Sequence, residues 1–275
     1  MGIKRYFSDK NFERVKKDFK FLSKIIKDTH GEYDLSIRDN YFNIYYKGYS
    51  IGKITPKEIN AYAVLIHSDF YSETTAYNRF SCCSKKVAKK YCTIFLKPDQ
   101  LYPFFQKKYL NEFASRVKDK RYGEIVFEQS IITDNLNRDE IIIIDRQIIY
   151  PQSKKKRLDL LALKQVNGNK FKIVLLEVKL GNNNELRGKV AEQLEGYVNH
   201  VKDHFDDYKE CYEKHYKQKK ELGLFEKPEY KEIEIVEPVE GMIVVGGYSG
   251  MAVDRIKILE KKYPHLDIKP FKHEL

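Results

Sequence analysis

The stretch from residue 157 to residue 197 constrains the fold of this chain more than any other part of the sequence. Residues 158–166 and 171–176 are short apolar runs, and a cluster of turn-forming residues at 167–170 separates them. Short apolar runs bounded by turn residues are typical of buried strands. The pattern therefore predicts two adjacent antiparallel strands, followed by a long helix.

Three charged residues lie in this predicted strand pair, where charge is unfavourable. Asp159 falls in the first strand, and Glu177 and Lys179 end the second. Residues two apart in a strand share a face, and the turn brings Asp159 beside Glu177. Buried charges need a partner or a metal ion, and Mg²⁺ favours a site with one or two carboxylates, waters and a phosphate oxygen. A structural ion pair at a strand end is the alternative explanation.

The same spacing of an acidic residue and a lysine occurs elsewhere, but without this context. None of the other copies ends a run of five or six apolar residues or follows an aspartate one hairpin upstream. These copies begin at Asp18, Asp207, Glu229, Glu260 and Asp267.

The arrangement resembles the PD-(D/E)XK nuclease superfamily, which has the restriction-endonuclease-like fold. Asp159, Glu177 and Lys179 match the motif aspartate, the acidic position and the lysine. Gln193 and Tyr197 lie four apart on the predicted helix, share a face, and resemble the Gln-x-x-x-Tyr motif of RecB-type members. The segment RQIIYPQSKKKRLDLLAL, residues 146–163, is similar to the lead-in of small single-strand and branched-DNA nucleases of this group.

The resemblance extends to a helix upstream but not to the residue before Asp159. Glu128, on a predicted helix at residues 122–133, matches the glutamate that many members carry on their first core helix. Glu124 lies one turn earlier on the same face and is an alternative to Glu128. Leu158 stands where the motif name has proline, a departure that is frequent in the superfamily.

The resemblance covers roughly residues 120–250 and implies Mg²⁺-dependent hydrolysis of phosphodiester bonds in nucleic acid, with Mn²⁺ as a substitute. Asp159 and Glu177 would bind the metal, with Glu128 acting directly or through water. Lys179 would position or activate the attacking water. Gln193 and Tyr197 would orient the motif or hold the substrate strand.

Charge and composition agree with a polyanionic partner. The 275 residues include 51 Lys and Arg against 40 Asp and Glu, a formal net charge of +11. Excess positive charge favours nucleic acid, and binding through phosphates weakens with salt. A basic run directly precedes Asp159 at the edge of the predicted site, where substrate phosphates would approach. It consists of Lys154, Lys155, Lys156 and Arg157.

Other partners and the compartment follow from simpler features. The chain has no run of eighteen apolar residues and no apolar signal core near its start, so we expect no membrane association. Four cysteines without a zinc-binding spacing are typical of a reducing, cytoplasmic compartment. DNA is favoured over RNA as the substrate, and a homodimer is one of the assemblies that the sequence allows.

The patterns predict two domains. Residues 1–120 form an α+β domain with an antiparallel meander over residues 32–54, which could bind nucleic acid or a partner. Residues 121–275 form an αβββαβ core, an α+β or α/β arrangement whose mixed central sheet is flanked by helices. Tyr41, Tyr45, Tyr46 and Tyr49 either stack on unpaired bases or pack as ordinary half-buried strand residues.

Some individual elements are also predicted. Lys85, Lys86, Lys89 and Lys90 would lie on neighbouring turns if this segment were a helix, either as a patch for a sugar-phosphate backbone or as an ordinary solvated face. Three long helices are expected, and residues 241–246 are expected to be the last core strand. The helices cover residues 8–28, 99–118 and 184–222, and the third is expected to become exposed beyond about Phe205.

The sequence favours a metal-dependent nuclease over one rival from another class. The rival is a catalytically inactive module with the nuclease fold that binds nucleic acid or a partner protein. The intact set of Asp159, Glu177 and Lys179 argues for the enzyme, because a site without activity has no chemical need for converging charges.

Overall fold

The computed structural model describes residues 3–58, 60–68, 70, 85–88, 90–116, 123–136, 138–149, 157–247 and 249–271. The chain forms two compact units. The N-terminal unit comprises Lys4–Tyr122 and Lys217–Glu226, and the C-terminal unit comprises Met1–Ile3, Gly123–Tyr216 and Lys227–Leu275. Within the described residues, no helix is both long enough and apolar enough to cross a membrane.

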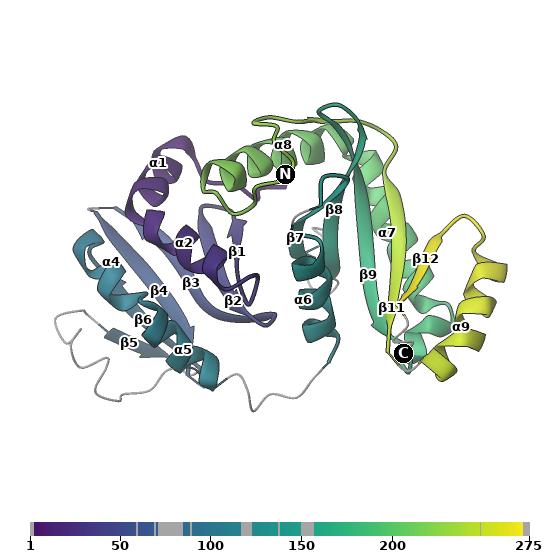
Figure 1. Cartoon of the computed structure of the whole chain (residues 1–275), viewed down its shortest axis with the longest axis horizontal. Helices are drawn as coiled ribbons and strands as arrows, with labels where there is room; N and C mark the ends of the chain where they lie inside the picture. The colour runs from purple at the N-terminus through teal and green to yellow at the C-terminus, as the bar shows by residue number, and fades with distance from the viewer. Residues whose placement is uncertain are drawn as a thin grey trace. The chain divides into compact units, whose positions relative to one another are not determined.

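The N-terminal unit is a six-stranded antiparallel sheet with helices packed on one face (Figure 1). Side chains on one side of the strands, such as Leu35, Ile44, Val64 and Ile94, join one core with residues of the helices. Strand order is β1-β2-β3-β4-β6-β5. The strands are β1 (Tyr33–Arg38), β2 (Tyr41–Tyr46), β3 (Tyr49–Lys57), β4 (Ala61–His67), β5 (Lys85–Ala88) and β6 (Tyr91–Leu96). The helices are α1 (Asp9–Asp18), α2 (Lys20–Asp28), α4 (Pro98–Phe104) and α5 (Lys107–Ser115).

The C-terminal unit contains a mixed sheet in the order β12-β11-β9-β8-β7. The pairs β7–β8 and β8–β9 are antiparallel, whereas β9–β11 and β11–β12 are parallel. The strands are β7 (Ile141–Ile149), β8 (Arg157–Asn167), β9 (Lys170–Leu180), β10 (Glu234–Ile235), β11 (Glu240–Gly246) and β12 (Asp267–Phe271). The helical elements are α6 (Glu124–Asp134), η1 (Asn184–Arg187), α7 (Lys189–Asp203), α8 (Phe205–Glu221) and α9 (Ser249–Lys262).

The expected combination of helices and strands, with an antiparallel sheet and a separate mixed sheet, is confirmed. The predicted hairpin is present as β8 and β9, with Gly168 at φ +47° in the turn. A positive φ is readily adopted by glycine, which has no Cβ.

Two glycines of β11 show which helix covers each face of the mixed sheet. A Cβ on Gly241 would lie 3.0 Å from side-chain atoms of Leu194 and Val198, so this face packs closely against α7. A Cβ on Gly246 would come within 2.1 Å of the Phe127 ring, so the opposite face packs against α6. Glycine is therefore needed where each helix approaches the strand.

Three helix predictions were wrong in extent. Residues 8–28 form two helices, because Phe19 ends the first and packs edge-on against the Phe42 and Tyr62 rings in the core. The region 99–118 likewise holds α4 and α5. The region 184–222 holds η1, α7 and α8, separated at Gly188 and His204. Periodicity in sequence does not reveal such breaks, since tertiary packing overrides it.

The C-terminal part of the third predicted helix, α8, buries one face, although we expected this part to become exposed. In α8 the Tyr212 hydroxyl donates to Asp145 Oδ2 at 3.1 Å, and His215 Nε2 lies 3.2 Å from the Ile144 carbonyl oxygen. Near the end of α8, Gln218 exchanges two hydrogen bonds with the backbone of Phe7 within the N-terminal unit. These polar contacts explain why a highly charged helix still buries one face.

Two further differences concern strands. Lys85–Ala88 forms β5, paired with β6, rather than a helical basic cluster, and Lys89 lies outside the described residues. β12 adds a parallel strand beside β11, so residues 241–246 do not form the last strand of the sheet. Only Ile268 of β12 is buried, which left no apolar run to detect in the sequence.

Candidate functional site

The strand pair places Asp159, Glu177 and Lys179 together, as the hairpin pattern predicts. Leu160 of β8 pairs with Leu176 of β9, so Asp159 lies opposite Glu177 across the two strands. Glu177 and Lys179 share a face with Leu175, whose partner on β11 is Gly241. Since Gly241 faces α7, the three charged side chains lie on the face of the sheet that α7 covers.

The geometry of these three groups is close and largely enclosed. Lys179 Nζ lies 3.1 Å from Glu177 Oε2 and 3.6 Å from Asp159 Oδ2. The Val178 N–H donates to Asp159 Oδ2 at 2.8 Å. Glu177 is 2% exposed and Lys179 6%. Glu177 Oε1 is buried and has no hydrogen-bond partner within the described parts of the chain.

Burial and mutual repulsion change the proton affinities of the two carboxylates. Burial raises the pKa of Glu177 to about 8, and the charge of Asp159 adds to this effect. Burial also raises the pKa of Asp159, although the Lys179 charge and the Val178 N–H oppose the increase. For Lys179, burial lowers the pKa, but the charges of Asp159 and Glu177 outweigh burial, so its pKa is raised overall. Lys179 is therefore an ammonium ion at neutral pH.

Glu128 of α6 belongs to a second polar group, which it forms with residues of β7. Arg146 Nη2 donates to Glu128 Oε2 at 3.2 Å, and Gln147 Nε2 donates to the same carboxylate at 3.0 and 3.2 Å. Arg146 Nη1 also donates to Gln129 Oε1 at 2.6 Å. Burial raises the pKa of Glu128 to about 7, and the charge of Asp159 contributes in the same direction.

Glu124, the alternative to Glu128, contacts the end of β9. Its Oε1 atom accepts hydrogen bonds from the Leu180 N–H at 3.3 Å and from Asn183 Nδ2 at 2.5 Å. Its charge also raises the pKa of Asp159. Glu124 thus connects α6 directly to the segment that follows Lys179.

The remaining predicted site residues are less closely associated with the carboxylates. Gln193 is partly exposed on α7 and makes no side-chain hydrogen bond to any described residue, whereas Tyr197 is buried. Arg157 is exposed at the first position of β8. Lys154, Lys155 and Lys156 lie outside the described residues.

The sequence patterns did not point to Glu185, Asn183, Arg146 or Gln147. Glu185 Oε2 lies 3.7 Å from Lys179 Nζ, and the Glu185 N–H donates to Asn183 Oδ1 at 2.9 Å. The available signal was a polar segment, GNNNE, directly after a buried strand, where functional loops often begin.

The number of protein ligands available to a metal ion is limited. Among the described residues, no group of three or more His, Cys, Asp or Glu side chains is arranged to hold a metal ion. Asp159 and Glu177 would thus supply two carboxylates, which is within the range that Mg²⁺ uses when waters and phosphate oxygens complete its shell. The buried Oε1 atom of Glu177, which lacks a partner, is compatible with such an ion.

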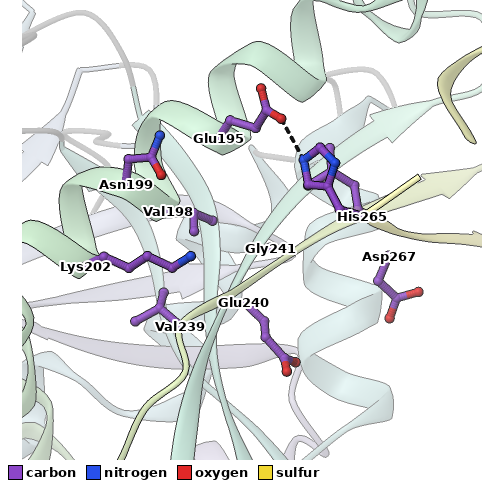
Figure 2. A pocket seen from close by; sticks show the side chains of 10 residues that line it. Glu195, Val198, Asn199, Lys202, Val239, Glu240, Gly241, His265 and Asp267 are labelled. Carbon is purple, nitrogen blue, oxygen red and sulfur yellow. Dashed lines mark hydrogen bonds and ion pairs between the residues drawn. The ribbon is translucent and has the colours of Figure 1, made fainter. Parts of the chain in front are cut away.

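A pocket of about 430 Å³ lies at a different place in the C-terminal unit (Figure 2). It is lined by the second half of α7, the start of β11 and residues 265–267, and none of the predicted site residues lines it. His265 Nε2 lies 2.7 Å from Glu195 Oε1, as Figure 2 shows. Glu240 pairs with Lys172.

The stability of the cation-free protein should fall as the pH rises. Glu177 changes from an ordinary pKa of 4.5 to about 8 on folding, and Glu128 from 4.5 to about 7. Between these values the folded state binds more protons than the unfolded state, so the free energy of unfolding decreases with pH. Urea unfolding in EDTA across this range measures the slope. Glu177→Gln should flatten it, and a stability that rises with pH would contradict the assignment.

Comparison with known proteins gives no relative. No protein-family model, curated protein or solved structure matches this chain.

Proposed function

We propose that the C-terminal unit is a Mg²⁺-dependent nuclease that hydrolyses phosphodiester bonds in nucleic acid, with DNA favoured over RNA. The observation that carries this proposal is the buried group of Asp159, Glu177 and Lys179, in which Glu177 Oε1 has no partner within the described residues. The elements α6, β7, β8, β9, α7 and β11 occur in the αβββαβ order expected for the restriction-endonuclease-like core, with η1, α8 and β10 as additional elements between β9 and β11. Fold order alone does not determine function, so the site has the greater weight.

Asp159 and Glu177 would hold the cation, with Glu128 or Glu124 acting through water. Such a cation stabilises negative charge on a phosphate group and lowers the pKa of a bound water. Mn²⁺ would substitute for Mg²⁺. A divalent cation bound here would favour the ionised form of both side chains, because it would offset their burial and relieve the repulsion between the two carboxylates.

Lys179 would act as a hydrogen-bond donor. Its pKa is raised, since Asp159 and Glu177 outweigh the effect of burial, and an ammonium ion cannot accept a proton. It would therefore orient the attacking water and stabilise charge that develops on the phosphate oxygens. Gln193 and Tyr197 on α7 would orient this group or contact the substrate strand, and the basic residues 154–157 would bind phosphates.

The proposal is tested by incubating the full chain with labelled single-strand, duplex and branched DNA and with RNA, in Mg²⁺, Mn²⁺ or EDTA. We expect cleavage that requires a divalent cation and is faster on at least one DNA substrate than on RNA. The net charge of +11 predicts that substrate binding weakens as salt increases. Binding that is independent of the cation, without cleavage of any substrate, would instead favour an inactive nucleic-acid-binding module.

A further inference from the structure

Lys179 lies among three carboxylates, and the third comes from η1. Its Nζ atom is 3.1 Å from Glu177, 3.6 Å from Asp159 and 3.7 Å from Glu185 Oε2. The other carboxylate oxygen of Glu185 lies 2.6 Å from Lys189 Nζ. Asp159 and Glu177 would hold the proposed cation, whereas the Glu185 carboxylate contacts the two lysines.

We propose that Glu185 is a positioning residue that holds the Lys179 ammonium group and thereby leaves Asp159 and Glu177 available to a divalent cation. This inference rests on the proposed function. The ammonium group and the cation would compete, because both are attracted to the same two carboxylates and repel each other. A third carboxylate beside Lys179 gives the ammonium group an alternative partner when the cation binds.

The segment between β9 and α7 is held so that Glu185 has a defined place. Arg255 Nη1 of α9 donates to the carbonyl oxygens of Gly181 at 3.1 Å and Asn183 at 3.0 Å. The Asn183 side chain accepts from the Glu185 N–H and donates to Glu124. Residues of α9 and α6 therefore hold the segment in place. Because Glu185 is already positioned, it loses little conformational entropy when it pairs with the ammonium group of Lys179.

The lysine-mediated role differs from a direct role of Glu185 in attracting the cation. If Glu185 acts through Lys179, its effect on cation affinity must disappear once the ammonium group is removed. If Glu185 attracts the cation directly through its charge, the effect must persist. A double-mutant cycle separates the two, since it measures the coupling between the residues.

The experiment measures Mn²⁺ affinity of the full chain by isothermal titration calorimetry, without substrate. Glu185→Gln should weaken Mn²⁺ binding by about tenfold, which corresponds to about 1.4 kcal/mol. In the Lys179→Met background, Glu185→Gln should change the affinity by less than about twofold. An equal loss in both backgrounds, or no loss in either, would overturn the inference.

Two controls keep the outcome interpretable. Glu210→Gln removes an exposed glutamate that pairs with Lys214 four residues away on α8, and it should leave Mn²⁺ affinity unchanged. Lys179→Gln replaces Lys179→Met if the latter does not fold, as judged by circular dichroism. A native chain that binds no Mn²⁺ would refute the proposed function itself. A native chain that binds Mn²⁺ but shows no coupling would refute only the role of Glu185.

Discussion

Replacing Glu177 with Gln is expected to lower Mg²⁺-dependent cleavage by about 10²-fold to 10³-fold, a loss of the size seen when one preorganised hydrogen-bond donor is removed from an oxyanion hole. Gln retains the size and shape of the side chain but cannot carry the negative charge that would hold the cation. The native carboxylate is 2% exposed and has one oxygen without a partner within the described residues. The change should therefore affect cation binding far more than packing.

The same replacement should not reduce stability in the absence of cations. Burial raises the pKa of Glu177 to about 8, so ionised Glu177 is unfavourable in the folded state, and Gln avoids this cost at high pH. Cleavage rates and urea unfolding in EDTA measure the two effects separately. Glu240→Gln is the matched control, because Glu240 lies in the same sheet and pairs with Lys172 rather than with the site. Glu177→Gln activity within tenfold of the native chain would contradict the proposed role.

Replacing Arg146 with Met is expected to destabilise the C-terminal unit by about 3–5 kcal/mol, the usual cost of removing one partner from a buried ion pair. Arg146 is 1% exposed and donates to Glu128 at 3.2 Å and to Gln129 at 2.6 Å. The loss of Arg146 would leave the Glu128 carboxylate buried without the positive charge of the guanidinium group. Urea unfolding followed by circular dichroism measures the change.

The destabilisation caused by Arg146→Met should depend on pH. The pKa of Glu128 is raised to about 7 mainly by burial and would rise further without the opposing charge of Arg146. Glu128 is therefore protonated at low pH, and Arg146→Met should be less destabilising at about pH 5 than at about pH 8.

A second replacement distinguishes charge from packing. Adding Glu128→Leu to Arg146→Met should recover much of the lost stability, because an apolar pair can replace a buried ion pair. Arg138→Met, at an exposed position between α6 and β7, is the control and should have little effect. A double variant no more stable than Arg146→Met would show that the ion pair is not the main contribution of Arg146.

Short-range patterns were sufficient to predict the arrangement around Asp159. Strand alternation and a four-residue turn depend only on residues close together in the sequence. The turn placed Asp159 opposite Glu177, and the alternation placed Lys179 on the same face as Glu177. The meander at residues 33–57 was predictable for the same reason, since turn residues and alternating side chains mark each strand.

Features that depend on distant contacts were not predictable in this way. The break at Phe19 follows from ring packing against Phe42 and Tyr62, and the burial of α8 follows from bonds to Ile144 and Asp145. The strand β12 has one buried residue and is stabilised by pairing with β11, which no pattern within residues 267–271 reveals.

The sequence alone determined which charged groups meet at the end of the β8–β9 hairpin, because strand alternation is a local property of the chain. Only the tertiary structure decided what surrounds them. Glu185, fixed by Arg255 and Asn183, reaches Lys179 through a folded segment, and Arg146 engages Glu128 from a neighbouring strand. The physical reason is that hydrogen bonds and ion pairs between distant segments depend on how helices pack on the sheet, and residue spacing carries no record of that packing.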